Sequence, residues 1–227
     1  MAFCYLVFFY LTIIEYEFLV CYNKNDFIIG MSDLFMKEDI EKLDKLICDM
    51  QMLMKYIYKE IKEFDIRVMF SAMIIKKTID NLTCAKYVLR NSIATVQISL
   101  LRLLCDNCLA IESAKELGLE RMMELIKNNE QVNQIMIDDE QNMSDGYLKR
   151  QVSLRFPKFD KIYRFACEGV HFSQQALSFA FEKTENGAKL NMNPGNKDMK
   201  ETMLSVNNNI VIVTNIIGSM LKEVVLK

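Results

Sequence analysis

Apolar side chains recur at helical spacing along much of the chain. Between residues 40 and 64 the steps alternate between three and four, at Ile40, Leu43, Ile47, Met50, Met54, Ile57, Ile61 and Phe64. This spacing forms one stripe of a helix that packs along another helix. We interpret it as a bundle helix rather than as half of an intermolecular coiled coil. A second helix over 67–82 is expected to return antiparallel, so residues 31–83 are predicted to form a helical hairpin.

The next part of the chain predicts a core built around one buried helix. Residues 84–117 have a long helical pattern that ends at Gly118, a residue type that often follows a helix end. The stretch from Ile98 to Ile111 is apolar nearly all round, which is typical of a buried central helix. Further helices are predicted over 119–136, over 147–155 after an acidic loop at Asp138–Gly146, from Pro157 to about Phe181, and over 197–225.

Strand-like alternation is confined to one short stretch. Residues 187–195 (GAKLNMNPG) alternate between two turn signals, which predicts a short extended arm near residues 188–194. The chain has only 7 Gly and 2 Pro, far below the roughly 12% of average usage, so a many-turned β-sandwich is excluded. The predicted fold class is all-α: a bundle of six or seven helices with a long N-terminal helical hairpin.

The N-terminal 22 residues are the most hydrophobic stretch of the chain. They lack the basic start and the small-residue cleavage site of a secretory signal. Glu15 and Glu17 offset the insertion energy of the apolar residues, so insertion of this stretch into a membrane is marginal. Its aromatic and β-branched content also suits a strand or an aggregation-prone segment. Membrane contact is therefore expected only through residues 1–22.

A third interpretation of the N-terminus is that the native domain starts later. Met31 is followed by Ser32 and Asp33, either of which can cap the helix that follows. We therefore expect residues 1–30 to be a hydrophobic extension outside the native fold. Residues 31–227 are expected to form a single helical domain, with the hairpin over 31–83 and the helical core over 84–227.

Charge and cysteine content exclude several function classes. The 28 Lys and Arg against 30 Asp and Glu lack the basic surplus of a general nucleic-acid binder. A local basic patch remains at Lys149, Arg150, Arg155, Lys158, Lys161 and Arg164. Cys105 and Cys108 form a CxxC without a second pair, and the chain has one His, so neither a metal site nor a cofactor is expected. The seven cysteines are expected to be buried free thiols in a reducing cytoplasm.

The chain's only histidine lies in the segment YRFACEGVHFS, residues 163–173. Arg164 and His171 are seven residues apart, so on one helix they share a face about 10 Å apart along the axis. Glu168 lies between them on that face. On an earlier helix, Arg102 and Asp106 have the i,i+4 spacing of an ion pair inside an apolar run.

This arrangement resembles the Arg-x4–6-His motif of the HEPN superfamily, all-helical proteins of toxin–antitoxin, abortive-infection and CRISPR-associated systems. The segment Cys-Glu-x-Val-His-Phe-Ser also resembles a poorly characterised family of helical bacterial proteins, and this resemblance covers roughly residues 85–220. In that family an Arg and an acidic residue on an earlier helix, matched here by Arg102 and Asp106, accompany the His.

The resemblance implies a metal-independent endoribonuclease that forms its composite site in a dimer. His171 would then move a proton at the ribose 2′-hydroxyl or the leaving oxygen. Arg164 would stabilise the charge on the phosphorane. The resemblance assigns supporting roles to Glu168, Ser173, Arg102 and Asp106. It also implies a cytoplasmic protein of a phage-defence or stress system, with a homodimer, an RNA substrate and an antitoxin-type protein partner.

A non-catalytic helical interaction module is the alternative. In this interpretation Arg164, Glu168 and His171 form a structural or ligand-contact network. Phe165 stands directly after the Arg, where active HEPN members tend to carry a polar residue. The overall acidic balance favours this alternative too, because a surface that cleaves RNA should carry local Lys and Arg.

Overall fold

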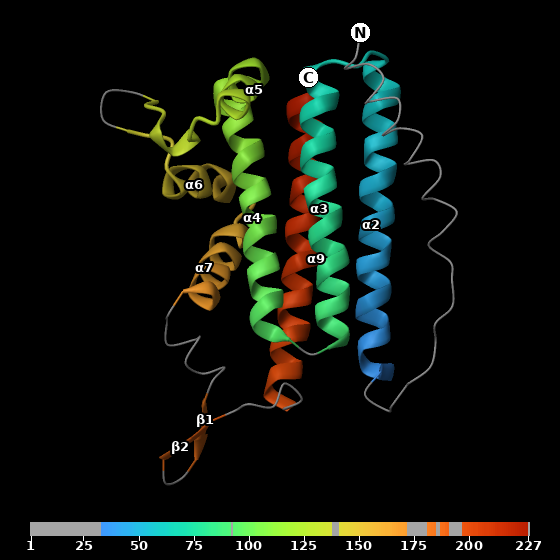
Figure 1. The fold of residues 1–227 in the computed structure, drawn as a ribbon, viewed down its shortest axis with the longest axis vertical. Coiled ribbons are helices and arrows are strands. Elements are labelled where there is room, and N and C mark those ends of the chain that lie inside the picture. The colour runs from blue at the N-terminus through green and yellow to red at the C-terminus, as the bar shows by residue number, and fades with distance from the viewer. Residues whose placement is uncertain are drawn as a thin grey trace. The chain divides into compact units, whose positions relative to one another are not determined.

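The computed structural model describes residues 33–91, 93–137, 141–171, 181–184, 187–190 and 197–226. The whole of the predicted N-terminal extension over 1–30 therefore lies outside the described residues, as does Ser173. Within the described part, seven α-helices confirm the all-α fold class (Figure 1). From Phe35 onward these elements belong to one compact unit, Phe35–Lys227.

The described elements are helices along most of the chain, with one pair of short strands before the last helix. In chain order they are α2 Asp33–Ile61, α3 Ile66–Arg90, α4 Ala94–Leu117, α5 Leu119–Asn128, a 3-10 turn at Val132–Gln134, α6 Asp145–Arg155, α7 Lys158–Val170, β1 Phe181–Thr184, β2 Gly187–Leu190 and α9 Lys197–Val225. The helix predicted over 197–225 has the bounds of α9, and the helix predicted over 147–155 lies within α6.

Helix α2 uses the predicted apolar stripe to pack on the bundle. Leu43, Met50 and Ile57 are buried, whereas Phe64 at the end of the stripe lies beyond the helix and is half exposed. The contacts that place α2 are long-range: Asp44 pairs with Lys86 of α3 at 2.5 Å, and Asn207 of α9 donates to Asp39 at 3.1 Å. The N-terminal helical hairpin is therefore present.

The break between two helices predicted near residue 83 is wrong. Helix α3 continues through it to Arg90, and α4 begins only at Ala94. The helix continues at this point, and the Thr83 hydroxyl donates to the Ile79 carbonyl one turn earlier at 2.8 Å. The helix instead ends at Asn91, whose backbone N–H bonds back to the Tyr87 carbonyl at 3.2 Å.

Helix α4 is the central element, as predicted. Ile98, Leu101, Leu104 and Ile111 are completely buried along its length. It packs most extensively on α9, and it also contacts α3, α5, α6 and α7 (Figure 1). The helix ends at Gly118, whose φ of 82° is the left-handed conformation that favours glycine.

Two predicted helices end earlier in the structure than the sequence suggested. The helix predicted over 119–136 is α5, which stops at Asn128 because Asn129 adopts a left-handed φ of 56°. The helix predicted from Pro157 to about Phe181 is α7, which stops at Val170. Pro157, expected in its first turn, is instead the residue directly before the helix, with a helical φ of −56°.

The extended arm predicted near 188–194 is one half of a hairpin in the structure. Strand β2 pairs antiparallel with β1, with Phe181 opposite Leu190 and Thr184 opposite Gly187. Phe181, predicted as the end of a helix, is therefore a strand residue. Residues 191–194 of the predicted arm lie outside the described part.

Two described helices are long and apolar enough, by length and composition, to cross a membrane. They are α4 and the Glu201–Val225 part of α9. Much of each is already covered within the bundle, 61% of the apolar window of α4 and 50% of that of α9. Central helices of helical bundles meet the same criteria.

Candidate functional site

The buried face of α7 fixes how this helix presents its other face. Phe159, Ile162, Tyr163 and Ala166 are buried on this side. Near the end of the helix, Gly169 packs directly on α4: a Cβ at this position would lie 2.4 Å from Cγ2 of Ile98. This close approach and the buried stripe set the rotation of α7 about its own axis, so that the opposite side faces solvent.

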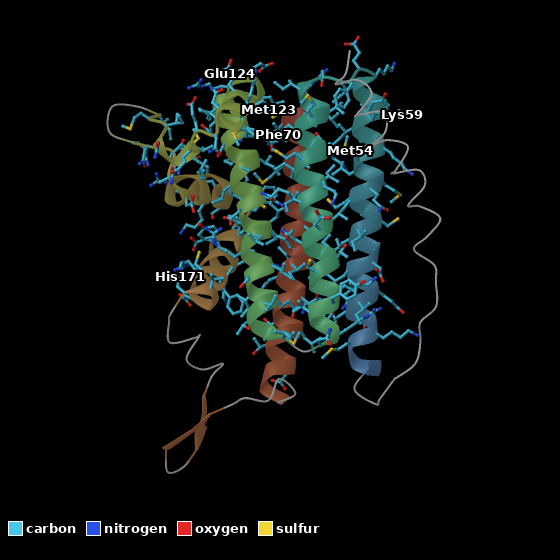
Figure 2. The ribbon with its side chains drawn as sticks, viewed as in Figure 1. Met54, Lys59, Phe70, Met123, Glu124 and His171 are labelled. Carbon is cyan, nitrogen blue, oxygen red and sulfur yellow. The ribbon has the colours of Figure 1, made fainter. Side chains whose placement is uncertain are left out.

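The solvent-facing side of α7 carries the residues that the sequence singled out. Lys161, Arg164, Glu168 and His171 are all exposed. His171 is not within the helix as predicted, but is the first residue after it, with an extended ψ of 161° (Figure 2). Its backbone N–H still bonds to the Cys167 carbonyl at 3.1 Å, the helical pattern, which keeps its Cα in register.

Arg164 does not stand free on this surface. Its Nη2 atom lies 2.5 Å from Oδ2 of Asp160, one turn earlier on α7. Lys149 of α6 binds the other oxygen of the same carboxylate at 2.8 Å. The hydrogen bond from Lys149 is the main reason why the pKa of Asp160 is below its usual value of 3.8, and the charge of Arg164 adds to the effect.

Arg102 and Asp106 form the predicted ion pair, and the structure adds two partners to it. Nη2 of Arg102 donates to the Tyr163 hydroxyl at 2.7 Å and to Asp145 at 3.1 Å, and the guanidinium lies 4.4 Å from the centre of the Tyr163 ring. The Tyr163 hydroxyl in turn donates to Asp145 at 3.1 Å. Burial raises the pKa of Tyr163 above its usual value, so the phenol stays protonated and can donate.

These contacts sort the predicted site residues into two groups. Arg102 and Asp106 belong to a network that ties α4 to Asp145 and to Tyr163, on the buried side of α7. Arg164, Glu168 and His171 remain together on the outer side of α7.

A second charged cluster was missed by the sequence analysis. Glu112, only 1% exposed, pairs with Arg155, which also binds Glu223 at 2.6 Å. Lys115 lies 3.8 Å from Glu112 and 3.6 Å from Glu223. Arg155, predicted as part of a basic patch, is therefore directed into the bundle, where it joins α6 to α4 and α9. The one signal in the sequence is a carboxylate placed directly after the apolar run of α4.

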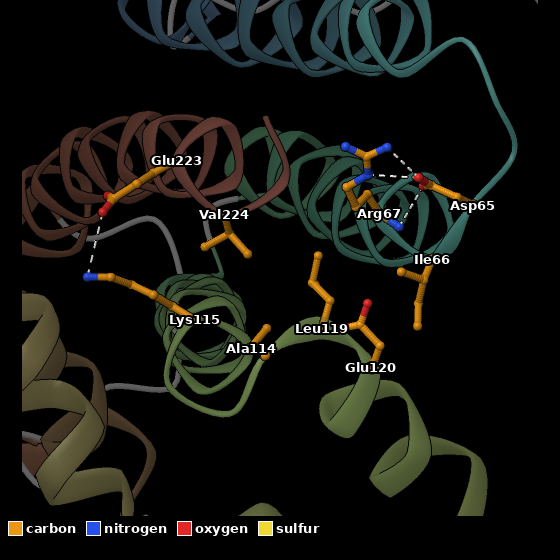
Figure 3. A pocket seen from close by; sticks show the side chains of 10 residues that line it. Asp65, Ile66, Arg67, Ala114, Lys115, Leu119, Glu120, Glu223 and Val224 are labelled. Atoms are coloured by element: carbon orange, nitrogen blue, oxygen red, sulfur yellow. Dashed lines mark hydrogen bonds and ion pairs between the residues drawn. The ribbon is translucent and has the colours of Figure 1, made fainter. Parts of the chain in front are cut away.

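A shallow groove of about 540 Å³ lies beside this cluster. Lys115 and Glu223 stand at one end and Glu120 at the other, with Ala114, Leu119 and Val224 between them (Figure 3). Arg67 borders the groove, but Asp65 binds its guanidinium at 2.6 Å. The lining thus combines an apolar floor with charges that largely balance one another.

The cysteines do not assemble a chemical site in the described part. Burial raises the pKa of Cys105 to about 12 and that of Cys108 well above its usual value, so both thiols are protonated at neutral pH. The expectation of buried thiols is wrong for Cys48 and Cys84, which are exposed. Among the described residues, no group of three or more His, Cys, Asp or Glu is placed to hold a metal ion.

Comparison with known proteins adds no relative. The chain matches no family model, no curated protein and no solved structure.

Proposed function

We propose that this protein is a HEPN-like, metal-independent endoribonuclease of a bacterial defence or stress system, acting in the cytoplasm as a dimer. The observation that supports this most is the exposed imidazole of His171 at the end of α7, in helical register with the exposed guanidinium of Arg164. The packing of Gly169 on Ile98 supports it further, because it fixes the end of α7 against α4 directly before His171.

The two side chains suit the two needs of RNA cleavage without a metal. The ribose 2′-hydroxyl attacks the adjacent phosphorus while a base removes its proton, and an acid protonates the leaving 5′-oxygen. Imidazole performs both tasks near neutral pH. A guanidinium stabilises the extra negative charge on the phosphorane. In a dimer with two α7 helices facing each other, one His171 serves as base and the other as acid.

A non-catalytic interaction module is the second candidate, and one observation favours it. Arg164 is already paired with Asp160, so its guanidinium has a partner within the chain. In this case the exposed side of α7 would contact a protein partner such as an antitoxin.

Cleavage of RNA in the presence of EDTA distinguishes the two. We expect the wild type to cleave mixed single-stranded RNA, and His171→Ala to lose at least about 100-fold in rate, the usual contribution of a general acid–base group. Arg164→Ala should also be strongly impaired. Arg121→Ala, which removes an exposed, ion-paired Arg on α5, is the matched control and should retain activity.

Folding and oligomeric state are checked by circular dichroism and light scattering for every variant. A folded, dimeric wild type that leaves RNA intact would support the interaction module. Cleavage that survives in His171→Ala would show that another group, or a contaminating nuclease, is responsible.

A further inference from the structure

The α6–α7 segment is basic within an acidic chain. Between Asp145 and His171 the sequence has six Lys or Arg and only three acidic residues, whereas the whole chain has a net charge of −2. Arg155 is used inside the bundle by Glu112 and Glu223. The other five cations belong to the outer parts of α6 and α7, with Lys158, Lys161 and Arg164 exposed on α7. This surface therefore suits an anionic partner.

Asp160 lies between two of these cations. Its two oxygens are 2.8 Å from Lys149 Nζ and 2.5 Å from Arg164 Nη2, so one carboxylate is shared by cations from two helices. A single negative charge leaves an excess of one positive charge in this trio. Of the other two acids, Asp145 is engaged by Arg102 and Tyr163, and Glu168 lies one turn after Arg164 on the exposed side of α7.

The positions of the carboxylate oxygens are those that phosphate oxygens would take. A guanidinium and an ammonium both bind carboxylates and phosphates through the same N–H donors. The Arg164 side chain remains 65% exposed while it is paired, so an incoming anion can reach it. The Lys149 side chain is only 22% exposed, so exchange of the carboxylate for a phosphate is most accessible at Arg164, where the pair is exposed and therefore weak.

We propose that Asp160 is an internal stand-in for a backbone phosphate, holding Arg164 and Lys149 in the free protein and giving them up when RNA binds across α6 and α7. This inference rests on the proposed function. It adds that the Asp160 carboxylate competes with an RNA phosphate for the same two cations. Asp160 is then a residue that tunes substrate affinity. Replacement of Asp160 should therefore strengthen RNA binding. If its contacts only supported the fold, the same replacement would weaken RNA binding.

The test is the affinity of Asp160→Asn for single-stranded RNA. Binding of a fluorescently labelled RNA is measured by anisotropy in EDTA, with His171→Ala in every protein so that the RNA stays intact. We expect Asp160→Asn to bind about two- to fivefold more tightly, the range that release of an exposed ion pair allows. The slope of log K against log salt should become steeper by about 0.7 for each cation released to the RNA.

Asp80→Asn is the matched control. Asp80 also pairs with a cation on its own helix, Lys76 of α3 at 2.5 Å, so its substitution changes the net charge equally at a remote site. It should leave the affinity unchanged. In a second control, Arg164→Gln combined with Asp160→Asn should lose most of the gain, because Arg164 is one of the two cations that are set free.

The outcomes separate this inference from the proposed function. If the His171→Ala protein binds RNA and Asp160→Asn binds no more tightly than Asp80→Asn, the stand-in role is wrong while the ribonuclease remains. The stand-in role is also wrong if the protein with both Asp160→Asn and Arg164→Gln keeps the full gain in RNA affinity. If no variant binds RNA and the wild type does not cleave it, both proposals fall together.

Discussion

At the scale of single residues, the placement of α7 depends on a glycine, Gly169. Gly169 lets the backbone of α7 come so close to α4 that a Cβ would meet Ile98 Cγ2 at 2.4 Å. Real Cβ atoms do not come that close, so any larger residue must push the two helices apart or force Ile98 into another rotamer. His171 follows two residues later, so the geometry of the candidate site depends on this contact.

We predict that Gly169→Ala destabilises the protein by about 1–2 kcal/mol. In an open helix the same substitution is favourable, because glycine is a poor helix former, but here the overpacking outweighs that gain. Urea unfolding followed by circular dichroism measures the change. We also expect a loss of RNA cleavage larger than the loss of stability explains.

Gly146→Ala is the control for this experiment. Gly146 lies in the first turn of α6, and the nearest atom to an added Cβ is the Ser144 hydroxyl oxygen at 3.9 Å. It should be neutral or stabilising. Ile98→Ala should relieve the clash, so the double variant with Gly169→Ala should be more stable than the two single effects predict. Simple additivity would contradict the proposed contact.

Residue patterns in the sequence predicted some of the candidate site and not the rest. The pair of Arg102 and Asp106 follows from i,i+4 spacing alone and is confirmed. The partners Tyr163 and Asp145 come from other helices, and only the tertiary structure brings them there. The pairing of Lys149 with Asp160 is of the same kind, because it joins α6 to α7.

At the scale of elements, one buried carboxylate holds three helices together. Glu112 of α4 is almost completely buried and pairs with Arg155 of α6, which also binds Glu223 of α9. A buried charge is tolerated only when it is paired. Helix α6, which is short, is therefore attached to the bundle by electrostatics as well as by Leu148 and Val152.

We predict that Arg155→Met lowers the free energy of unfolding by about 3 kcal/mol, because it leaves the charge of Glu112 buried without its main partner. Arg150→Met on the same helix removes an exposed Arg and should have little effect. The combination of Glu112→Gln with Arg155→Met should recover part of the loss. Denaturant unfolding checks all three, and an Arg155→Met protein as stable as Arg150→Met would contradict the pairing.

The existence of the helices was predictable, whereas some of their ends were not. Apolar spacing defines a helix over its whole length, so α2 and α9 were found with nearly correct bounds, whereas α4 begins at Ala94, well after the predicted residue 84. An end depends on one residue and its local contacts. Asn129 ends α5 by adopting a left-handed conformation, which residues other than glycine adopt only rarely. Val170 ends α7 with no glycine or proline after it, so the sequence pattern gave no stop signal there.

At the scale of the whole molecule, the described core draws on residues from Met36 to Leu226. We predict that a chain of residues 31–227 folds cooperatively, with a free energy of unfolding within about 0.5 kcal/mol of that of the full chain, a change typical of substitutions away from the core. Urea unfolding of the two chains measures the difference. The shortened preparation should also be more soluble, because the most hydrophobic segment is gone. A non-cooperative transition in the shortened protein would show that residues 1–30 belong to the native fold.

The central position of α4 has a consequence for how the protein is made. Its most extensive neighbour, α9, lies at the other end of the chain, so the ribosome completes α4 at Leu117 well before it reaches Val225. At the usual rate of translation this interval lasts about 5 to 20 s. During that time the apolar surface of α4 is not yet covered by α9. We therefore expect the nascent chain to depend on a chaperone such as a ribosome-bound holdase.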